Sequence, residues 1–277
     1  MTNQSRALLR ERYVFVGRLV METALHLGGG HESVTATDSP ILRDAGGQPF
    51  IPGSSLKGAF RSAVERLAPA MGYSSCALLA DAADCFTVTT DQKLKDEYQR
   101  LAGSIGREKG MTEDKLLEWV EKHLCDTCKL FGSTVLASRV RFADLRVDDK
   151  TWLGITQVRD GVGINRDTER AEDRIKYDFE VVPPGTAFMF EMVVENPTPT
   201  DKALLAIGLA EFESGMVPMG GIRSRGLGRC KLELDPIQHW DFEQANTLKA
   251  YLLERKGAQT LTLKEFVQAA LAPQGGH

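Results

Sequence analysis

Four of the five cysteines lie within one stretch of the chain. Cys125 and Cys128 form a C-x-x-C pair directly before a Leu-Phe-Gly turn, and Cys76 and Cys85 lie upstream. Tetrahedral zinc takes four such ligands. The set therefore predicts a zinc site with Cys85, Cys125 and Cys128 as ligands, Cys76 as the fourth and His123 as its rival. A redox pair is disfavoured because the motif follows a polar helical stretch, and buried free thiols are the other interpretation.

The segment IPGSSLKGAFR, residues 51–61, joins a turn to the start of a cationic helix. Ser54 or Ser55 can cap the first helical turn, whose N–H groups attract anions. Lys57 and Arg61 are four residues apart and share one helix face. This stripe suits a phosphate backbone, and a solvated cationic face is the equally open alternative.

A second cationic segment is MGGIRSRGLGRCK, residues 219–231, which has four cations, four glycines and no acidic residue. Glycines let backbone N–H groups approach phosphates, and arginines are forked donors. We therefore favour anion binding over a tight turn before an edge strand whose charges only add solubility. The segment fits neither a dinucleotide-binding fingerprint nor a P-loop.

Asp38 is the main catalytic candidate. It lies in a T-D-S-P loop that leads toward the cationic helix. A loop carboxylate can hold a metal ion or activate a hydroxyl group, and the sequence does not separate these roles. An Asx turn is the structural alternative.

The elements that must position these residues follow the order strand–helix–strand–strand–helix–strand. Apolar periodicity predicts strands near 13–22, 139–147, 186–195 and 230–234, and helices near 55–69 and 201–214. This order is the split βαβ, ferredoxin-like pattern of an α+β fold, with both helices on one sheet face. Residues 73–132 interrupt it as an insertion with helical stretches near 91–102 and 112–124.

Composition limits the classes of protein. The 277 residues carry 34 Lys+Arg against 38 Asp+Glu, a net charge of −4, which excludes a protein that coats nucleic acid through bulk charge. Residues 214–231 nevertheless carry four cations and no acidic residue, so a local cationic track is possible. The absence of a long apolar run or an apolar signal core predicts a cytoplasmic protein with reduced cysteines and no membrane partner.

Together these motifs resemble the RAMP superfamily of CRISPR systems, specifically the backbone subunit of type III effector complexes. The resemblance rests on LHLGGG, DSPILRDAGGQPFIPGSSLKGAFR, GVGINRDTERA and MGGIRSRGLGRCKL, which occur in family order over most of residues 14–234. The string CDTCKLFG is similar to the zinc-binding insertion of some branches.

The resemblance implies a modified RNA-recognition-motif palm at 1–72 and 133–240, with a thumb hairpin at about 155–180. It also implies an inserted zinc-bearing lid at 73–132, followed by a helical tail at 241–277. The implied partners are a CRISPR guide RNA, complementary target RNA, other RAMP-type and signature subunits, and further copies of the chain.

In the same way, Asp38 takes the position of the family's catalytic aspartate, which uses Mg²⁺ or Mn²⁺ to promote attack of a ribose 2′-OH on target RNA. The expected RNA contacts are Ser54, Ser55, Lys57, Arg61, Ile164, Asn165, Arg166, Gly220, Gly221, Arg223, Ser224 and Arg225. Two alternatives stay open: a guide-RNA scaffold without cleavage activity, and a zinc-dependent enzyme unrelated to RNA.

Overall fold

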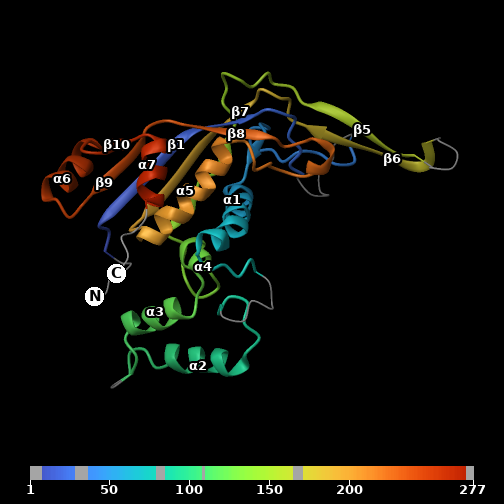
Figure 1. The fold of residues 1–277 in the computed structure, drawn as a ribbon. Helices are drawn as coiled ribbons and strands as arrows, with labels where there is room; N and C mark the ends of the chain where they lie inside the picture. The colour runs from blue at the N-terminus through green and yellow to red at the C-terminus, as the bar shows by residue number, and fades with distance from the viewer. Residues whose placement is uncertain (1–7, 29–36, 79–84, 108–109, 165–170, 273–277) are drawn as a thin grey trace.

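A computed structural model describes residues 8–28, 37–78, 85–107, 110–164 and 171–272 (Figure 1). Strand β1 (Glu11–Met21) lies at the centre of its main, antiparallel sheet. Alternate side chains of β1 are buried, among them Tyr13, Phe15 and Leu19. This alternation is what a strand with one face against a core requires.

Five further strands complete the main sheet. The strands and their bounds are β3 (Val140–Phe142), β7 (Ala187–Glu195), β8 (Cys230–Leu234), β9 (Ile237–Asp241) and β10 (Gln259–Leu261). β7 pairs with one edge of β1, while β9 and β8 share the other edge, β9 along the first half of β1 and β8 along the second. β3 lies beyond β7, and β10 lies beyond β9. The spatial order through the middle of the sheet is therefore β8-β1-β7-β3.

Helices α1 (Gly53–Leu67) and α5 (Pro199–Glu213) lie on the same side of this sheet (Figure 1). They cross closely because Gly208 has no side chain: a Cβ atom there would lie 2.2 Å from the Phe60 ring. Phe60 also stacks on Phe212, with ring centroids 5.7 Å apart. The predicted α+β class is confirmed.

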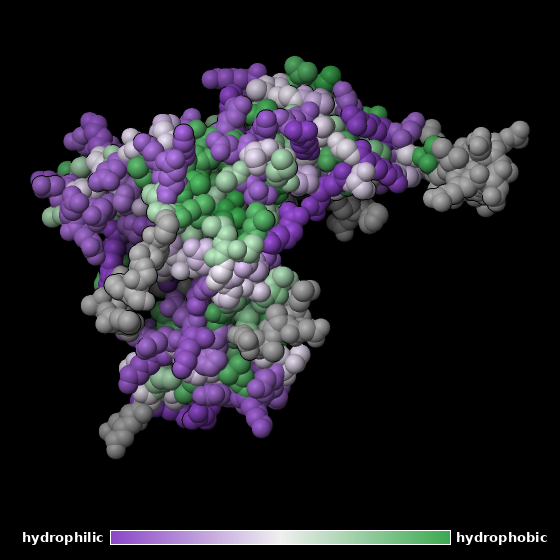
Figure 2. Space-filling view, viewed as in Figure 1, coloured by the Kyte–Doolittle hydropathy of each residue, from purple (hydrophilic) through white to green (hydrophobic). Residues whose placement is uncertain are grey.

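The C-terminal residues belong to the same body. Helix α7 (Leu263–Leu271) packs against α5, and α6 (Ala245–Glu254) lies beside β9. The sequence predicts only helices after residue 240, but this position falls within β9, and β10 extends the sheet further. In the space-filling view the surface around α6, β9 and β10 is mostly hydrophilic (Figure 2). We call residues 8–72 and 133–272 the main body.

Two short sheets lie outside the main one. β2 (Phe50–Ile51) pairs with β4 (Leu145–Arg146), so the strand predicted at 139–147 is divided between two sheets. β5 (Gln157–Ile164) and β6 (Ala171–Val181) form an antiparallel hairpin that projects from the body (Figure 1). Ile164 ends β5, whereas Asn165 and Arg166 lie outside the described residues.

The insertion, residues 73–132, hangs below the body and has a core of its own (Figure 1). Its helices are α2 (Gln92–Ala102), α3 (Glu113–Lys122) and α4 (Asp126–Phe131), and the first two match the predicted helical stretches. Phe86, Tyr98 and Trp119 contact one another through their rings. The 3-10 turn η1 (Ala68–Met71) connects α1 to this region. In the described part of the chain, no helix has the length and apolar character needed to cross a membrane.

Candidate nucleic-acid interface and metal centre

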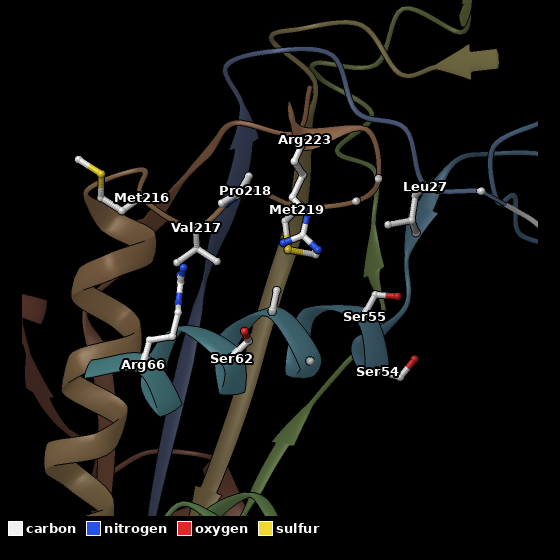
Figure 3. A pocket seen from close by; sticks show the side chains of 15 residues that line it. Leu27, Ser54, Ser55, Ser62, Arg66, Met216, Val217, Pro218, Met219 and Arg223 are labelled. Carbon is white, nitrogen blue, oxygen red and sulfur yellow. The ribbon is translucent and has the colours of Figure 1, made fainter. Parts of the chain in front are cut away.

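An open groove of about 680 Å³ separates α1 from the glycine-rich loop that follows α5 (Figure 3). The groove is lined by Leu27, Gly28, Ser54, Ser55, Gly58, Ala59, Ser62, Arg66, Met216, Val217, Pro218, Met219, Gly220, Gly221 and Arg223. The two cationic segments that the sequence singles out thus form opposite walls of one groove. Arg66 rises from α1 and Arg223 descends from the loop, so guanidinium groups approach the space from both sides (Figure 3).

The stripe of α1 that faces the groove is Ser55, Ser62 and Arg66, with Gly58 between the first two. These residues recur at helical spacing and therefore share one face. No heavy atom lies within 4 Å of the position of a Cβ at Gly58, so this side of the helix faces open space. Ser62 and Arg66 are missing from the sequence-based set, although their spacing from Ser55 was a usable signal.

The start of α1 differs from the prediction. The helix begins at Gly53 without a side-chain cap, so the predicted capping by Ser54 or Ser55 is wrong. Instead, the N–H of Gly53 donates to Asp144 Oδ1 at 2.7 Å. Gly53 also allows close contact with the neighbouring chain, because a Cβ there would lie 2.5 Å from the carbonyl oxygen of Phe142. Both serines therefore lie within the first turn.

Lys57 and Arg61 lie on a different stripe of α1 and do not line the groove. Arg61 Nε donates to Glu65 at 2.7 Å, and its Nη2 lies 3.2 Å from Cys128 Sγ. Lys57 is half-buried, and both burial and the positive charge of Arg61 lower its pKa. The two residues share a face, as the spacing predicts, but Arg61 is directed at the cysteines.

Two glycines of the loop, Gly220 and Gly228, allow a close approach of neighbouring backbone. A Cβ at Gly220 would lie 2.3 Å from the carbonyl oxygen of His26, and the N–H of Gly221 donates to that oxygen at 2.8 Å. At Gly228 a Cβ would lie 1.9 Å from the carbonyl oxygen of Met219. Both Gly220 and Gly228 have positive φ, which favours glycine.

The four cations of this loop divide into two pairs. Arg229 and Lys231 form ion pairs with Glu22, at 2.6 and 3.4 Å, so their charges are compensated by an acidic residue distant in the sequence. Within the described residues, no carboxylate pairs with Arg223 or Arg225. The Arg225 guanidinium lies over the Tyr177 ring, 5.6 Å from its centroid.

Within the same loop, Arg223, Ser224 and Arg225 form the 3-10 turn η2 (Arg223–Arg225), and all three are exposed. The contact between Arg225 and Tyr177 therefore joins the glycine-rich loop to strand β6 of the hairpin.

Asp38 is fixed to the base of the hairpin. Its backbone N–H donates to Asp178 Oδ1 at 2.6 Å, and the N–H of Asp178 donates to Asp38 Oδ2 at 3.1 Å. The next residue, Ser39, accepts a backbone hydrogen bond from Glu180 at 3.0 Å. Strand β6 therefore determines where the Asp38 carboxylate lies.

Buried His26 connects the Asp38 loop to the groove. Its Nδ1 lies 2.8 Å from the Glu180 carbonyl oxygen, and its Nε2 lies 3.3 Å from Ser39 Oγ. Its own carbonyl accepts the hydrogen bond from Gly221. His26 is buried, and it is absent from the site residues predicted from the sequence.

The four cysteines predicted as ligands come together in the insertion. Their Sγ atoms all lie within 4.8 Å of one another, and all four side chains are buried. Tetrahedral coordination with Zn–S bonds of about 2.3 Å separates sulfurs by about 3.8 Å. The Sγ atoms of Cys76 and Cys128 are 3.6 Å apart, so the donor set fits a metal ion. Burial raises the pKa of Cys76 to about 11, whereas hydrogen bonds from Cys125 and Cys128 lower the pKa of Cys85.

Hydrogen bonds bring the separate cysteine segments together. Ser74 Oγ donates to Asp126 Oδ2 at 2.8 Å and accepts from the N–H of Asp126 at 2.9 Å, which attaches the Cys76 segment to the start of α4. The N–H of Phe86 donates to the carbonyl oxygen of His123 at 2.7 Å, which attaches the Cys85 segment to the end of α3.

His123 and Cys230 lie apart from the cluster. His123 Nδ1 is 2.7 Å from the Trp119 carbonyl oxygen, and its ring packs on Trp119 with centroids 4.1 Å apart. The structure therefore brings Cys76, not its rival, to the fourth position. Cys230 is buried on β8, where burial raises its pKa to about 12.

Comparison with known proteins identifies the family of the chain and several similar proteins. The family model of the RAMP superfamily matches residues 18–231. Among similar proteins, three are each named CRISPR system Cms endoribonuclease Csm3. The protein of Enterococcus italicus is 30% identical over 246 residues, which cover 83% of this chain and 95% of that protein. Those of Methanocaldococcus jannaschii (27%; 80% and 79%) and Methanothermobacter thermautotrophicus (26%; 83% and 89%) cover similar shares.

Proposed function

The chain belongs to the RAMP superfamily, and from this premise we propose that it is a guide-RNA-binding backbone subunit of a type III CRISPR effector complex. Its relatives are named as endoribonucleases of a CRISPR system, and in the complex this chain acts as an endoribonuclease that cleaves complementary target RNA. The observation that carries the proposal is the groove between α1 and the glycine-rich loop, which His26 connects to the Asp38 loop.

The fold supports a ferredoxin-like, RNA-recognition-motif palm. The sheet order β8-β1-β7-β3, with α1 and α5 on one side, is the order that the split βαβ pattern requires. The projecting β5–β6 hairpin takes the place of the thumb, and the insertion takes the place of the metal-bearing lid.

The groove suits a nucleic-acid backbone better than base edges. Arg66 and Arg223 present forked donors from opposite walls, and Ser55 and Ser62 add hydroxyl groups between them. Contacts of this kind fix the position of a strand without reading its sequence. Sequence selection then falls to pairing between guide and target, as in other guided systems.

Asp38 supplies the catalytic carboxylate in this proposal. Asp178 holds one of its oxygens through a backbone N–H, which fixes the orientation of the carboxylate. Asp38 then takes the proton of the 2′-OH as that oxygen attacks the adjacent phosphate and forms a 2′,3′-cyclic phosphate, while the leaving 5′-oxygen takes a proton from water. A Mg²⁺ or Mn²⁺ ion beside Asp38 would neutralise charge on the phosphate.

We assign zinc to the cysteine cluster, in a structural role. Four buried thiolates fill all positions of a tetrahedral ion and leave none for a substrate. The other subunits of the complex, further copies of this chain, guide RNA and target RNA are the proposed partners, and the cytoplasm is the proposed location.

The decisive experiment is cleavage of a complementary RNA by the assembled complex carrying Asp38→Ala. We expect cleavage to be lost while the complex still assembles on guide RNA. Asp149→Ala, at an exposed aspartate of the main body, is the matched control and should cleave normally. Unchanged cleavage by Asp38→Ala would identify a scaffold without this catalytic residue, and a native protein carrying no short RNA would favour a zinc enzyme unrelated to RNA.

A further inference from the structure

Arg61 occupies a place that the RNA-binding function does not explain. It lies on α1, only one residue before groove-lining Ser62, yet its side chain is turned toward the insertion. All three guanidinium nitrogens have partners there: Nε donates to Glu65 at 2.7 Å, Nη1 to the Gly132 carbonyl at 3.3 Å, and Nη2 to Cys128 Sγ at 3.2 Å. The side chain is only 14% exposed, and Arg61 does not line the groove.

We propose that Arg61 is a positioning residue for the metal-binding cysteines, which holds Cys128 in place and attaches the cluster to the RNA-binding helix. This inference rests on the proposed function only where RNA affinity is concerned. Its basis is the contact that the largely buried guanidinium of Arg61, on α1, makes with Cys128.

Electrostatics support this role. Four thiolates around a divalent cation leave net negative charge in a buried site, and a neighbouring guanidinium offsets part of it. Thr87 Oγ1 also donates to Cys128 Sγ at 3.2 Å, so this sulfur receives two hydrogen bonds. Partners of this kind orient metal ligands, and their loss typically weakens metal binding by about 10–100-fold.

Glu65 keeps the guanidinium in position from the next turn of the same helix. It is 10% exposed and pairs with Arg61 at the spacing that places two residues on one face. Lys at this position would keep the charge, but its single nitrogen could not reach Glu65, Gly132 and Cys128 in the planar geometry of arginine. The conservative substitution therefore tests geometry separately from charge.

Because α1 is a continuous helix, the two sides of it are mechanically linked. Arg61 contacts the cluster on one side, while Ser62 and Arg66 line the groove on the other. When Arg61 is fixed to the cysteine cluster, it therefore also restrains α1, whose opposite side lines the groove.

The test uses the full chain loaded with Zn²⁺ and measures the rate at which a chromogenic chelator removes the metal. We expect Arg61→Ala to release zinc about tenfold faster or more than the wild type, with Arg61→Lys close to Arg61→Ala. Arg100→Ala, an exposed arginine of α2 in the same insertion, is the matched control and should release zinc at the wild-type rate. Absorption of the Co²⁺-substituted protein gives a second readout, and we expect its thiolate bands to change in Arg61→Lys.

RNA affinity separates this role from the phosphate contact that the sequence suggested. Arg66→Ala should weaken binding of guide RNA and flatten its salt dependence while leaving zinc release unchanged. If Arg61→Ala and Arg61→Lys released zinc at the wild-type rate and weakened RNA binding like Arg66→Ala, Arg61 would be a phosphate contact and the inference would be overturned. If no variant and not even the wild type bound RNA, the proposed function would fail, and the zinc measurements would still decide the role of Arg61.

Discussion

The main body and the insertion bury their cores in different ways. In the main body, large apolar side chains such as Phe15, Phe60, Phe188 and Phe212 fill the space between the sheet and its helices. The buried cluster of the insertion has eight described residues, seven within 73–132 together with Leu136 of the main body, and four of them are cysteines. The first core is held by apolar burial, whereas the second is built around sulfur atoms that a metal ion can join.

The difference shows how a region too small to stabilise itself can still hold a fixed shape. Conformational entropy opposes folding at every residue, and a short region buries too little apolar surface to offset it. Coordination bonds provide the missing free energy in such cases. The main body needs no such help, because its sheet and helices α1, α5 and α7 bury a continuous core.

The largest expected effect comes from removing the metal ligands. Cys125→Ser with Cys128→Ser should unfold the insertion, because structural zinc contributes on the order of 10 kcal/mol to the folding of small domains. Limited proteolysis should cut between residues 73 and 132 while the main body remains resistant. Retained zinc with an unchanged cleavage pattern would show that the two cores do not differ in this way.

The next effect belongs to the main body. Phe60→Ala should lower the free energy of unfolding by about 3–5 kcal/mol, because it removes a fully buried ring that packs between Gly208 and Phe212. Thermal denaturation of the zinc-loaded chain measures this loss. Leu253→Ala, at a side chain 71% exposed, is the control and should change little. A loss below about 1 kcal/mol would mean that this core is not tightly packed.

The local features of the main body and of the insertion could be predicted from the sequence, but the contacts between these two regions could not. Cysteine spacing predicts Cys85, Cys125 and Cys128 as ligands and leaves Cys76 and His123 as rivals for the fourth position. Apolar periodicity gives the order of strands and helices, because both signals are local. The spacing of Lys57 and Arg61 shows that they share a face, but not that the insertion folds back beside that face. The position of the insertion depends on tertiary contacts, such as the one between Arg61 and Gly132.

The charge of the glycine-rich loop shows the same limit. Within the segment no acidic residue compensates the four cations, yet Glu22 pairs with Arg229 and Lys231 across some two hundred residues of sequence. His26 was missed for a related reason, since its burial depends on Ser39 and Glu180 coming to it in the fold. Strand β10 carries only three residues, too few for a periodic pattern.

A smaller effect tests whether RNA binding belongs to the main body alone. Arg223→Ala should lower RNA affinity about tenfold for all sequences and reduce the salt slope by about one, because one phosphate contact is lost. Filter binding at several salt concentrations measures both quantities. Lys150→Ala, at an exposed cation outside the groove, should leave them unchanged. Sequence-dependent losses would argue against a backbone contact.

The smallest effect concerns pH. Hydrogen bonds from Arg141 and Arg12 hold the pKa of Glu195 below its usual value, despite its partial burial. This carboxylate therefore stabilises the main body at pH values above its ordinary pKa, and the contribution is lost as the pH falls through the lowered pKa. Glu195→Gln should remove less than about 1 kcal/mol at neutral pH and make the acid limb of the stability curve shallower.

Chemical denaturation of the zinc-loaded protein between neutral pH and about pH 4 measures this difference. The insertion should respond to acid in a different way, because protonation of thiolates releases metal. An identical acid response in Glu195→Gln and wild type would show that Glu195 does not contribute to the pH dependence of stability.

Strand β6 holds Asp38 near the end at which the hairpin joins the main body. Asp178 lies near its root, and Ala171, at the other end of β6, lies seven residues away, or roughly 23 Å along an extended strand. A tilt that carries the far end of β6 through several ångströms moves the root by only a fraction of that distance. The carboxylate is thus attached where such a tilt displaces it least, so a tilt of the hairpin would leave Asp38 close to its present position.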